Sequence, residues 1–184
     1  MVCSSVYSLI IVIFDEFGGS KGCSSLIMES DMNELLEIEQ IKQLKARYLR
    51  GLDTNDWDTF AGSMTEDCRG RYNGGKLSFD SREEIVAFMR DNLSGDKVIT
   101  LHQGHQPEVE IIDESHARGT WYLQDMVIHL EAGIRLYGSA IYRDVYRKIN
   151  GDWKISETGY QRVFEAVEPL GENHRITENM FVQG

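Results

Sequence analysis

An aspartate on the apolar face of an expected strand is the first feature of this sequence that could do chemistry. In residues 116–126, alternate positions place Gly119, Trp121, Leu123 and Asp125 on one strand face. Burying an unpaired carboxylate is costly, which favours its protonated form, and a protonated carboxyl can serve as a general acid. The alternative is that Asp125 lies beyond a bulge or bonds a turn, and strand parity alone leaves both readings open.

Histidine is the usual base near neutral pH, and a carboxylate partner would hold its tautomer. His102 and His105 form an H-x-x-H pair. Residues three apart on a strand point to opposite faces, so shared metal ligation is not expected and one of the two would face a pocket. The alternative for a histidine at a strand end is a structural role.

Three further side chains could border the same pocket. Tyr48 and Asp53 close an expected helix five residues apart, roughly 140° around its axis. They cannot lie side by side, but both can border one cavity, unless Tyr48 is core and Asp53 is solvated. Arg162 shares strand parity with Tyr160 and Phe164. It could clamp an anionic or carbonyl group of a ligand, or extend to solvent from the surface.

Patterns of several enzyme classes are absent from the sequence. Lys76 follows two glycines but precedes neither Ser nor Thr, so no Walker A loop is indicated. The sequence also lacks G-x-G-x-x-G and H-E-x-x-H patterns. These absences argue against a nucleotide cofactor and a zinc peptidase.

Composition narrows the class of protein. The 184 residues, 41% hydrophobic and 27% charged, suit one globular domain with a sizeable core. The formal net charge of −11 disfavours nucleic acid and anionic membranes as partners. Three cysteines, none spaced as C-x-x-C, suit neither a disulfide framework nor a zinc site. A reducing, cytoplasmic location is expected.

The first thirty residues are expected to be an extension outside the domain. The apolar run of residues 6–14 is too short to span a bilayer. No Lys or Arg precedes it and two acidic residues follow it, which is not the pattern of a signal peptide. We expect residues 1–30 to be disordered or to follow an upstream start codon, with a signal or anchor as the alternative. The domain is then residues 31–184.

Helical patterns occupy the first half of that domain. Residues 31–53 carry apolar side chains at helical spacing, with Asp31 as the expected N-cap and Glu34 completing a capping box. A short helix is expected from Trp57 to Met64. Further on, the sequence predicts a tight hairpin at Asn73-Gly74 and a helix opened by the capping box Ser81-Arg-Glu-Glu84.

Strand patterns occupy the second half. Stretches rich in Val, Ile, Tyr, Thr and Trp are separated by turn residues and cover residues 97–102, 106–113, 116–130, 134–149 and 152–166. Helices followed by a long-stranded meander indicate an α+β fold. We expect helices packed on a highly curved antiparallel sheet, a cone that encloses a pocket for a small ligand.

Taken together, the helix and strand positions resemble SnoaL-like proteins with the NTF2-like (cystatin-like) cone. More closely, the chain is similar to bile acid 7α-dehydratases. The resemblance extends from residue 38 to residue 180 at nearly constant spacing. It is carried by Ile38–Tyr48 with Leu52-Asp53 and Trp57-Asp58, Tyr72–Leu77, His102-Gln-Gly-His105 with Pro107-Glu108, Gly119–Asp125, Glu157–Arg162, Ile176-Thr and Asn179-Met180.

The resemblance implies a role for each matching position. Tyr48, His102 and Asp125 match the catalytic tyrosine, histidine and strand aspartate of that family, and Asp53 matches the carboxylate that partners the histidine. Two positions match substrate contacts, Tyr72 and Arg162. The resemblance further implies a homotrimer, no metal and no organic cofactor. The hairpin of residues 126–138 departs from the family in length and side chains, so the substrate is less certain than the reaction.

The resulting hypothesis is a dehydratase that eliminates water from a hydroxylated ring ketone. A 3-oxo-Δ4 steroid or bile-acid derivative, free or as its CoA thioester, is the expected hydrophobic substrate. His102 would remove an acidic C–H proton, Tyr48 and Tyr72 would bond the enolate oxygen, and Asp125 would assist departure of the hydroxyl. Alternatives are a ketosteroid-isomerase-type enzyme and a non-catalytic binder of small hydrophobic ligands.

Overall fold

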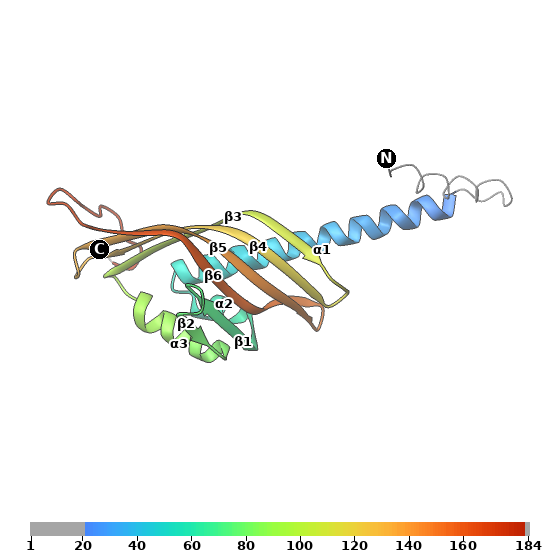
Figure 1. Cartoon of the computed structure of the whole chain (residues 1–184), viewed down its shortest axis with the longest axis horizontal. Coiled ribbons are helices and arrows are strands. Elements are labelled where there is room, and N and C mark those ends of the chain that lie inside the picture. The colour runs from blue at the N-terminus through green and yellow to red at the C-terminus, as the bar shows by residue number, and fades with distance from the viewer. Residues whose placement is uncertain (1–20, 183–184) are drawn as a thin grey trace. The chain divides into compact units, whose positions relative to one another are not determined.

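The computed structural model describes residues 21–182, with side chains from residue 31 onward. Three helices come first: α1 (Lys21–Asp53), α2 (Trp57–Gly62) and, after a hairpin, α3 (Arg82–Leu93). The hairpin strands are β1 (Met64–Tyr72) and β2 (Leu77–Phe79). Four long strands complete the fold, β3 (Val98–Ile111), β4 (His116–His129), β5 (Ile134–Ile149) and β6 (Asp152–Pro169). The expected α+β class is confirmed (Figure 1).

The first helix begins earlier than the sequence pattern indicated. Asp31 was expected as its N-cap, but the helix starts at Lys21, so this prediction is wrong. Residues 24–50 contain neither Gly nor Pro, so nothing in that stretch interrupts the helical backbone. Asn55, with φ 56°, leaves the helical conformation soon after α1 ends at Asp53. The apolar run of residues 6–14, Cys3 and the side chain of Cys23 lie outside the described residues.

The other local predictions are largely confirmed. The second helix ends at Gly62, two residues earlier than expected. Ser81 caps α3 by accepting the backbone N–H of Glu84, whose carboxylate in turn accepts the N–H of Asp80. The expected hairpin joins β1 to β2, with left-handed backbone at Asn73, Gly74 and Gly75 that this turn requires.

Six strands form one sheet in the order β2-β1-β6-β5-β4-β3. The three long antiparallel strands predicted after residue 115 are confirmed as β4, β5 and β6. The two separate strands expected at 97–102 and 106–113 are instead the single strand β3, interrupted by a register shift between His105 and Glu108. Gln106 has a φ of 47° at this irregularity, and the backbone then resumes pairing with β4. The pair β1–β6 is parallel, so the sheet is mixed.

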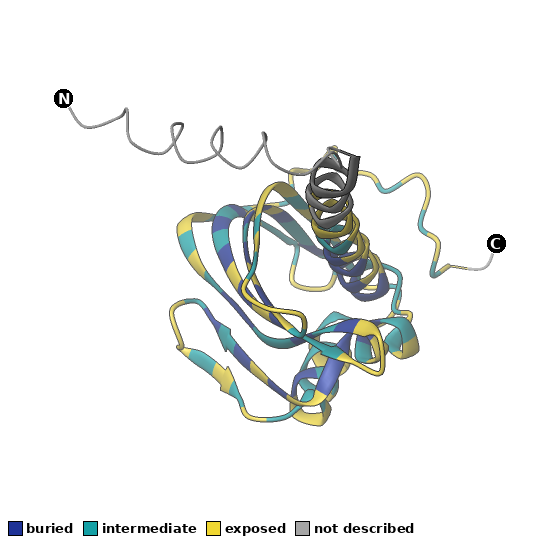
Figure 2. Ribbon diagram, turned by 90° about the vertical axis from the view of Figure 1, so that its right-hand side faces the viewer, coloured by how far each residue is buried: buried dark blue, intermediate teal, exposed yellow. Residues whose placement is uncertain are grey.

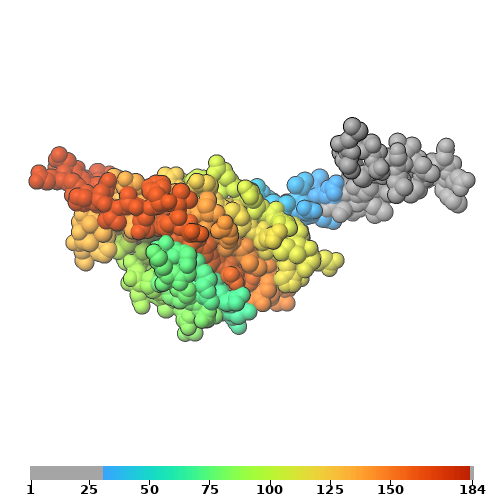
Figure 3. Space-filling view, in the orientation of Figure 1, coloured from blue at the N-terminus to red at the C-terminus, as the bar shows by residue number. Residues whose placement is uncertain are grey.

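The second half of α1, together with α2 and α3, packs on one face of this curved sheet, and alternate residues of β4 and β5 are buried (Figure 2). Residues of α1 from Ile41 to Leu52 pack with Phe60 of α2, Ile85 of α3 and Ile155 of β6. A second buried cluster of Tyr72, Trp121, Leu123, Ala140 and Tyr142 continues along the sheet. From the side shown in Figure 3, residues of β6 and of the hairpin of β1 and β2 lie in front, with parts of the longer strands β3, β4 and β5 beside them.

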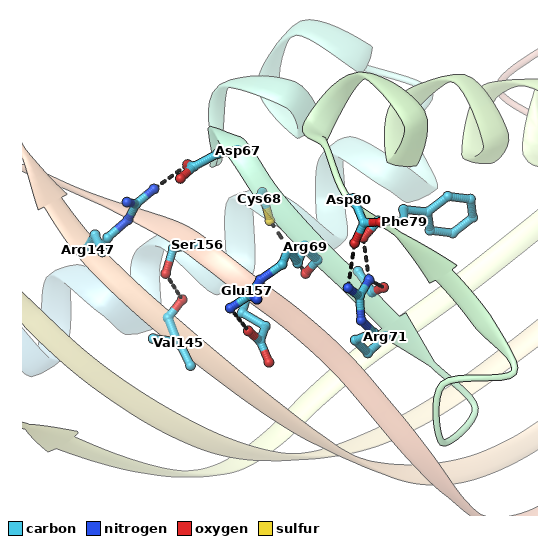
Figure 4. A network of polar contacts seen from close by, with 11 residues as sticks. Asp67, Cys68, Arg69, Arg71, Phe79, Asp80, Val145, Arg147, Ser156 and Glu157 are labelled. Carbon is cyan, nitrogen blue, oxygen red and sulfur yellow. Dashed lines mark hydrogen bonds and ion pairs between the residues drawn. The ribbon is translucent and has the colours of Figure 1, made fainter.

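Exposed ion pairs tie the short strand β1 to its neighbours (Figure 4). Arg69 bonds Glu157 of β6 at 2.7 Å, and Arg71 bonds Asp80 at 2.5 Å. Asp67 also pairs with an arginine of β5, Arg147. Such solvated pairs contribute at most about 1 kcal/mol each, so the buried clusters supply most of the stabilisation.

Within residues 21–182, none of the helices combines the length and the hydrophobicity that a membrane span requires.

Candidate active site

The C-terminal end of α1 brings Asp53 against the edge strand β3. Asp53 Oδ1 lies 2.6 Å from His102 Nδ1 and accepts a 2.7 Å hydrogen bond from Thr100 Oγ1. Its other oxygen accepts the backbone N–H of His102 at 2.8 Å. An ionised Asp53 accepts the Nδ1 proton and leaves Nε2 of His102 free as a base. The structure therefore joins two residues that are 49 positions apart and adds Thr100, which the sequence analysis missed.

Asp125 lies on the buried face of β4, as its strand parity predicted, and is 4% exposed. The carboxylate is not unpaired there, because Arg162 Nη1 and Nη2 donate to its two oxygens at 2.5 and 2.8 Å. Burial opposes the charged guanidinium, but the hydrogen bonds that it donates to Asp125, together with the charges of Asp125 and other neighbouring groups, raise the pKa of Arg162. Two parallel N–H···O hydrogen bonds of this kind fit the geometry of a carboxylate, because each of its oxygens accepts one of them.

Gly138 leaves the room that this ion pair needs. It is the cross-strand partner of Asp125 on β5. A Cβ at Gly138 would lie 2.6 Å from the carbonyl oxygen of Phe164 and 3.0 Å from Arg162 Nη1. Any larger residue would therefore displace the guanidinium or strand β6, so this glycine is needed for the Asp125–Arg162 geometry.

His102 and Asp125 are direct cross-strand partners on β3 and β4. The N–H of His102 donates away from β4, to Asp53. The two residues thus form a pair without mutual backbone hydrogen bonds, in which Cα atoms lie about 4.5 Å apart and side chains are close. The sheet places the histidine–aspartate couple beside the arginine–aspartate couple on one face.

Tyr48 and Tyr72 form the third part of the site. Their hydroxyl oxygens lie 3.0 Å apart, and both side chains are fully buried. Desolvation by burial, with smaller effects of neighbouring groups, raises the pKa of both phenols well above the ordinary value. Both residues therefore stay protonated at neutral pH and remain hydrogen-bond donors.

These raised pKa values predict how stability changes in alkali. The unfolded chain ionises its tyrosines near pH 10, whereas the folded state keeps Tyr48 and Tyr72 protonated above that value. Their contribution to stability is complete below about pH 10 and is lost as the pH rises further. We expect Tyr48→Phe to remove tyrosinate absorbance from the alkaline unfolding step alone. A loss of amplitude before unfolding would contradict this assignment.

A buried ion pair that the sequence analysis missed lies next to Tyr48. Lys45 Nζ is 2.7 Å from Asp144 Oδ2, and both side chains are almost completely inaccessible. The sequence does carry a signal, because Lys45 lies between apolar positions of α1 and Asp144 alternates with Tyr142 and Tyr146 on β5. Without a structure, neither residue indicates its partner on the other element.

Two other residues that could take part in chemistry are Cys68 and His105. Burial raises the pKa of the Cys68 thiol to about 12, so it is not poised as a nucleophile. The outward side chain of His105 belongs to the face opposite His102, as strand parity predicted. Among the described residues, no three His, Cys, Asp or Glu side chains are grouped to hold a metal ion.

A hollow of about 780 Å³ lies mainly on the outer face of the sheet. Its walls combine apolar side chains with Gln124, Arg135 and Ser139, and Asp125 and Gly138 also line it. The hairpin of residues 126–138 contributes Met126, Arg135 and Tyr137 to these walls. The tyrosine-lined inner face was expected to enclose a pocket, but Tyr48, Tyr72 and Tyr142 fill its centre with almost no exposed surface.

Comparison with known proteins gives the same fold. A hexachlorocyclohexane dehydrochlorinase (LinA, type 2) is 19% identical with a TM-score of 0.69, over 79% of this chain and 97% of its own. A proposed scytalone dehydratase from Novosphingobium aromaticivorans is 18% identical with a TM-score of 0.66, over 79% and 99%. ActVI-ORFA from Streptomyces coelicolor is 16% identical with a TM-score of 0.59, over 68% and 96%.

Identities this low establish a shared fold and leave the activity open. The family model for the SnoaL-like domain, in contrast, matches residues 33–159, which is more than half of the sequence. That range includes five of the six site residues predicted from the sequence, all but Arg162. On this match, the chain belongs to the family of SnoaL-like domains.

Proposed function

We propose that the protein is a cofactor-independent lyase that eliminates water from a hydroxylated ring ketone. The observation that carries the proposal is the juxtaposition of the Asp53–His102 couple with Asp125 across β3 and β4. The similar structures support it, since a dehydrochlorinase and a proposed dehydratase are both named for eliminations. Elimination needs a positioned base and a group that helps the leaving group depart.

The first step is removal of a C–H proton that the ring carbonyl makes acidic, through the conjugated double bond in a 3-oxo-Δ4 substrate. Nε2 of His102 accepts that proton, because Asp53 holds Nδ1 as the donor and stabilises the imidazolium that forms. Negative charge develops on the carbonyl oxygen. Neutral Tyr48 and Tyr72 donate hydrogen bonds to this oxygen, which requires the substrate to replace their mutual 3.0 Å contact.

The second step is departure of the hydroxyl group. The carboxylate of Asp125, fixed by Arg162, accepts a hydrogen bond from the leaving hydroxyl and orients it. The imidazolium of His102 then returns its proton to that oxygen, so the C–O bond breaks and water leaves. This scheme differs from the sequence-based hypothesis, in which a protonated Asp125 supplied the proton, because the bidentate pair gives Asp125 the role of an acceptor.

A 3-oxo-Δ4 steroid of the bile-acid type, free or as a CoA thioester, is the proposed substrate class. This finer assignment rests on the sequence resemblance to bile acid 7α-dehydratases. The test is incubation with a panel of 3-oxo-Δ4 steroids bearing a 7α-hydroxyl, free and as thioesters, followed by mass and ultraviolet absorbance. Loss of water with growth of a longer-wavelength absorbance is expected. A product of unchanged mass would indicate isomerisation, and tight binding without turnover would indicate a binder.

We also propose that the protein assembles as a homotrimer. The outer face of the sheet exposes large apolar side chains around the 780 Å³ hollow, namely Leu101, Tyr122, Tyr137 and Phe164. Exposed apolar surface of this kind is usual where a further chain binds. Light scattering of the full chain should give three times the 21.1 kDa chain mass. A mass of one chain at micromolar concentration would contradict the assembly.

A further inference from the structure

Two fully buried charges take no part in the proposed elimination. Lys45 on α1 and Asp144 on β5 are 1% and 2% exposed and form a 2.7 Å ion pair. Desolvation lowers the pKa of Lys45, and the Asp144 carboxylate opposes this shift. Replacing a buried ion pair by apolar residues of similar volume is often neutral or stabilising. A contribution to stability therefore does not explain why this ion pair is present in the core.

Asp144 is held in place by donors from its own strand and from the neighbouring strand β6. Its Oδ1 accepts a 2.7 Å hydrogen bond from Thr158 Oγ1 of β6, and its Oδ2 accepts one of 2.9 Å from the Tyr146 hydroxyl. That hydroxyl accepts the indole N–H of Trp121 on β4 at 2.9 Å. These hydrogen bonds hold the Asp144 carboxylate in place on the sheet. The ion pair with Lys45 then joins helix α1 to it.

Lys45 contacts the aromatic part of the candidate site directly. Its Nζ lies 3.5 Å from the ring centroid of Tyr142 and 4.8 Å from that of Tyr48, one helical turn further along α1. The Tyr142 ring meets Tyr160 edge-on at 5.4 Å, and the Arg162 guanidinium lies 4.9 Å from the centroid of Tyr160. Cation–π attraction holds such rings in place, most strongly where water is excluded.

From these contacts we propose that the Lys45–Asp144 ion pair is a positioning pair for the Tyr48–Tyr72 hydroxyls. The ammonium group, fixed by Asp144, lies between the rings of Tyr48 and Tyr142 and sets the orientation of both. Tyr48 has no exposed surface and its hydroxyl contacts Tyr72, so a small rotation of its ring moves the pair of donors. This inference rests on the proposed function, in which these donors bind the enolate oxygen.

The test is a variant that removes both charges, Lys45→Met with Asp144→Asn. Methionine keeps the apolar stem of lysine, and asparagine can still accept from Thr158 or Tyr146. Lys45→Met alone leaves an unpaired buried carboxylate and is expected to melt well below the wild type. The double variant should melt within a few degrees of the wild type, with kcat reduced about 10- to 100-fold and KM nearly unchanged.

Ile41→Val is the matched control, since Ile41 is equally buried one turn earlier on α1 and its apolar side chain can form neither a hydrogen bond nor an ion pair with Lys45 or Asp144. It should lower stability slightly without changing kcat. Equal losses of kcat in the control and the double variant would overturn the proposal. A folded double variant with wild-type kcat would also overturn it.

A second measurement does not depend on activity. Fluorotyrosine can be incorporated into the full chain, and the fluorine resonance of Tyr48 identified by its loss in Tyr48→Phe. In the double variant this resonance should shift or broaden, while Ile41→Val leaves it unchanged. If the wild type turned over no substrate, the proposed elimination would fail, but the resonance would still decide whether Lys45 positions Tyr48. An unchanged Tyr48 resonance in the double variant would overturn the positioning role.

Discussion

Replacing His102 with asparagine should lower turnover by about 100- to 10,000-fold, the usual range for loss of a general base. The shorter amide can still donate to Asp53, so the contact that holds the end of α1 to β3 is largely kept. What is lost is the free nitrogen that accepts the substrate proton. Steady-state kinetics on the steroid panel would measure the effect, with circular dichroism to show that the fold persists.

His105→Asn is the control for this variant. His105 lies on the same strand but on the opposite face from His102, where its exposed side chain lines the outer hollow. It should change turnover by less than about twofold, within the small effects usual for surface substitutions. Near-normal turnover of His102→Asn would rule out His102 as the base, and an equal loss in both variants would indicate a general effect of the strand.

Replacing Arg162 with methionine should destabilise the fold by about 3 kcal/mol or more. The reason is that Asp125, 4% exposed, would keep a charge without its bidentate partner. Thermal denaturation should show a loss of about 6 to 12 °C for a domain of this size. The same variant should lose most of its turnover.

Arg69→Met is the comparison that isolates burial. Arg69 also pairs with a carboxylate, Glu157, but both side chains are substantially exposed. Its replacement should cost no more than about 1 kcal/mol. Equal stability losses for Arg69→Met and Arg162→Met would show that burial does not increase the cost of breaking the Asp125–Arg162 ion pair.

The fold could be read from the sequence because its signals are local. Alternation on β4 placed Asp125 on the buried face, and the Ser81 capping box located α3. The wrong prediction at Asp31 also came from a local signal. Asp31 is a good N-cap residue, but the residues before it can themselves be helical, so α1 begins upstream of it, at Lys21. The sequence also suggested two strands where a bulge near Gln106 lets one strand continue.

The site was predictable as a set of residues but not as a set of contacts. Spacing alone could not pair Asp53 with His102, and the resemblance to a known family supplied that expectation. Arg162 was expected to contact substrate, whereas the structure pairs it with Asp125. Lys45 and Asp144 went unnoticed because neither residue indicates its partner on the other element, and the packing of α1 on β5 explains why both are buried.

The contact of Asp53 with the backbone of His102 has a consequence for solubility. Among the strands that the structure describes, β3 is the last of the sheet, so N–H groups on its outer side have no neighbouring strand there. Exposed strand edges of this kind invite pairing between molecules and hence aggregation. The Asp53 carboxylate accepts a hydrogen bond from one of these N–H groups and holds the end of α1 against the edge. A residue proposed for catalysis thus also prevents another strand from pairing at this point of the edge. Variants at Asp53 are expected to aggregate more readily as well as to lose activity.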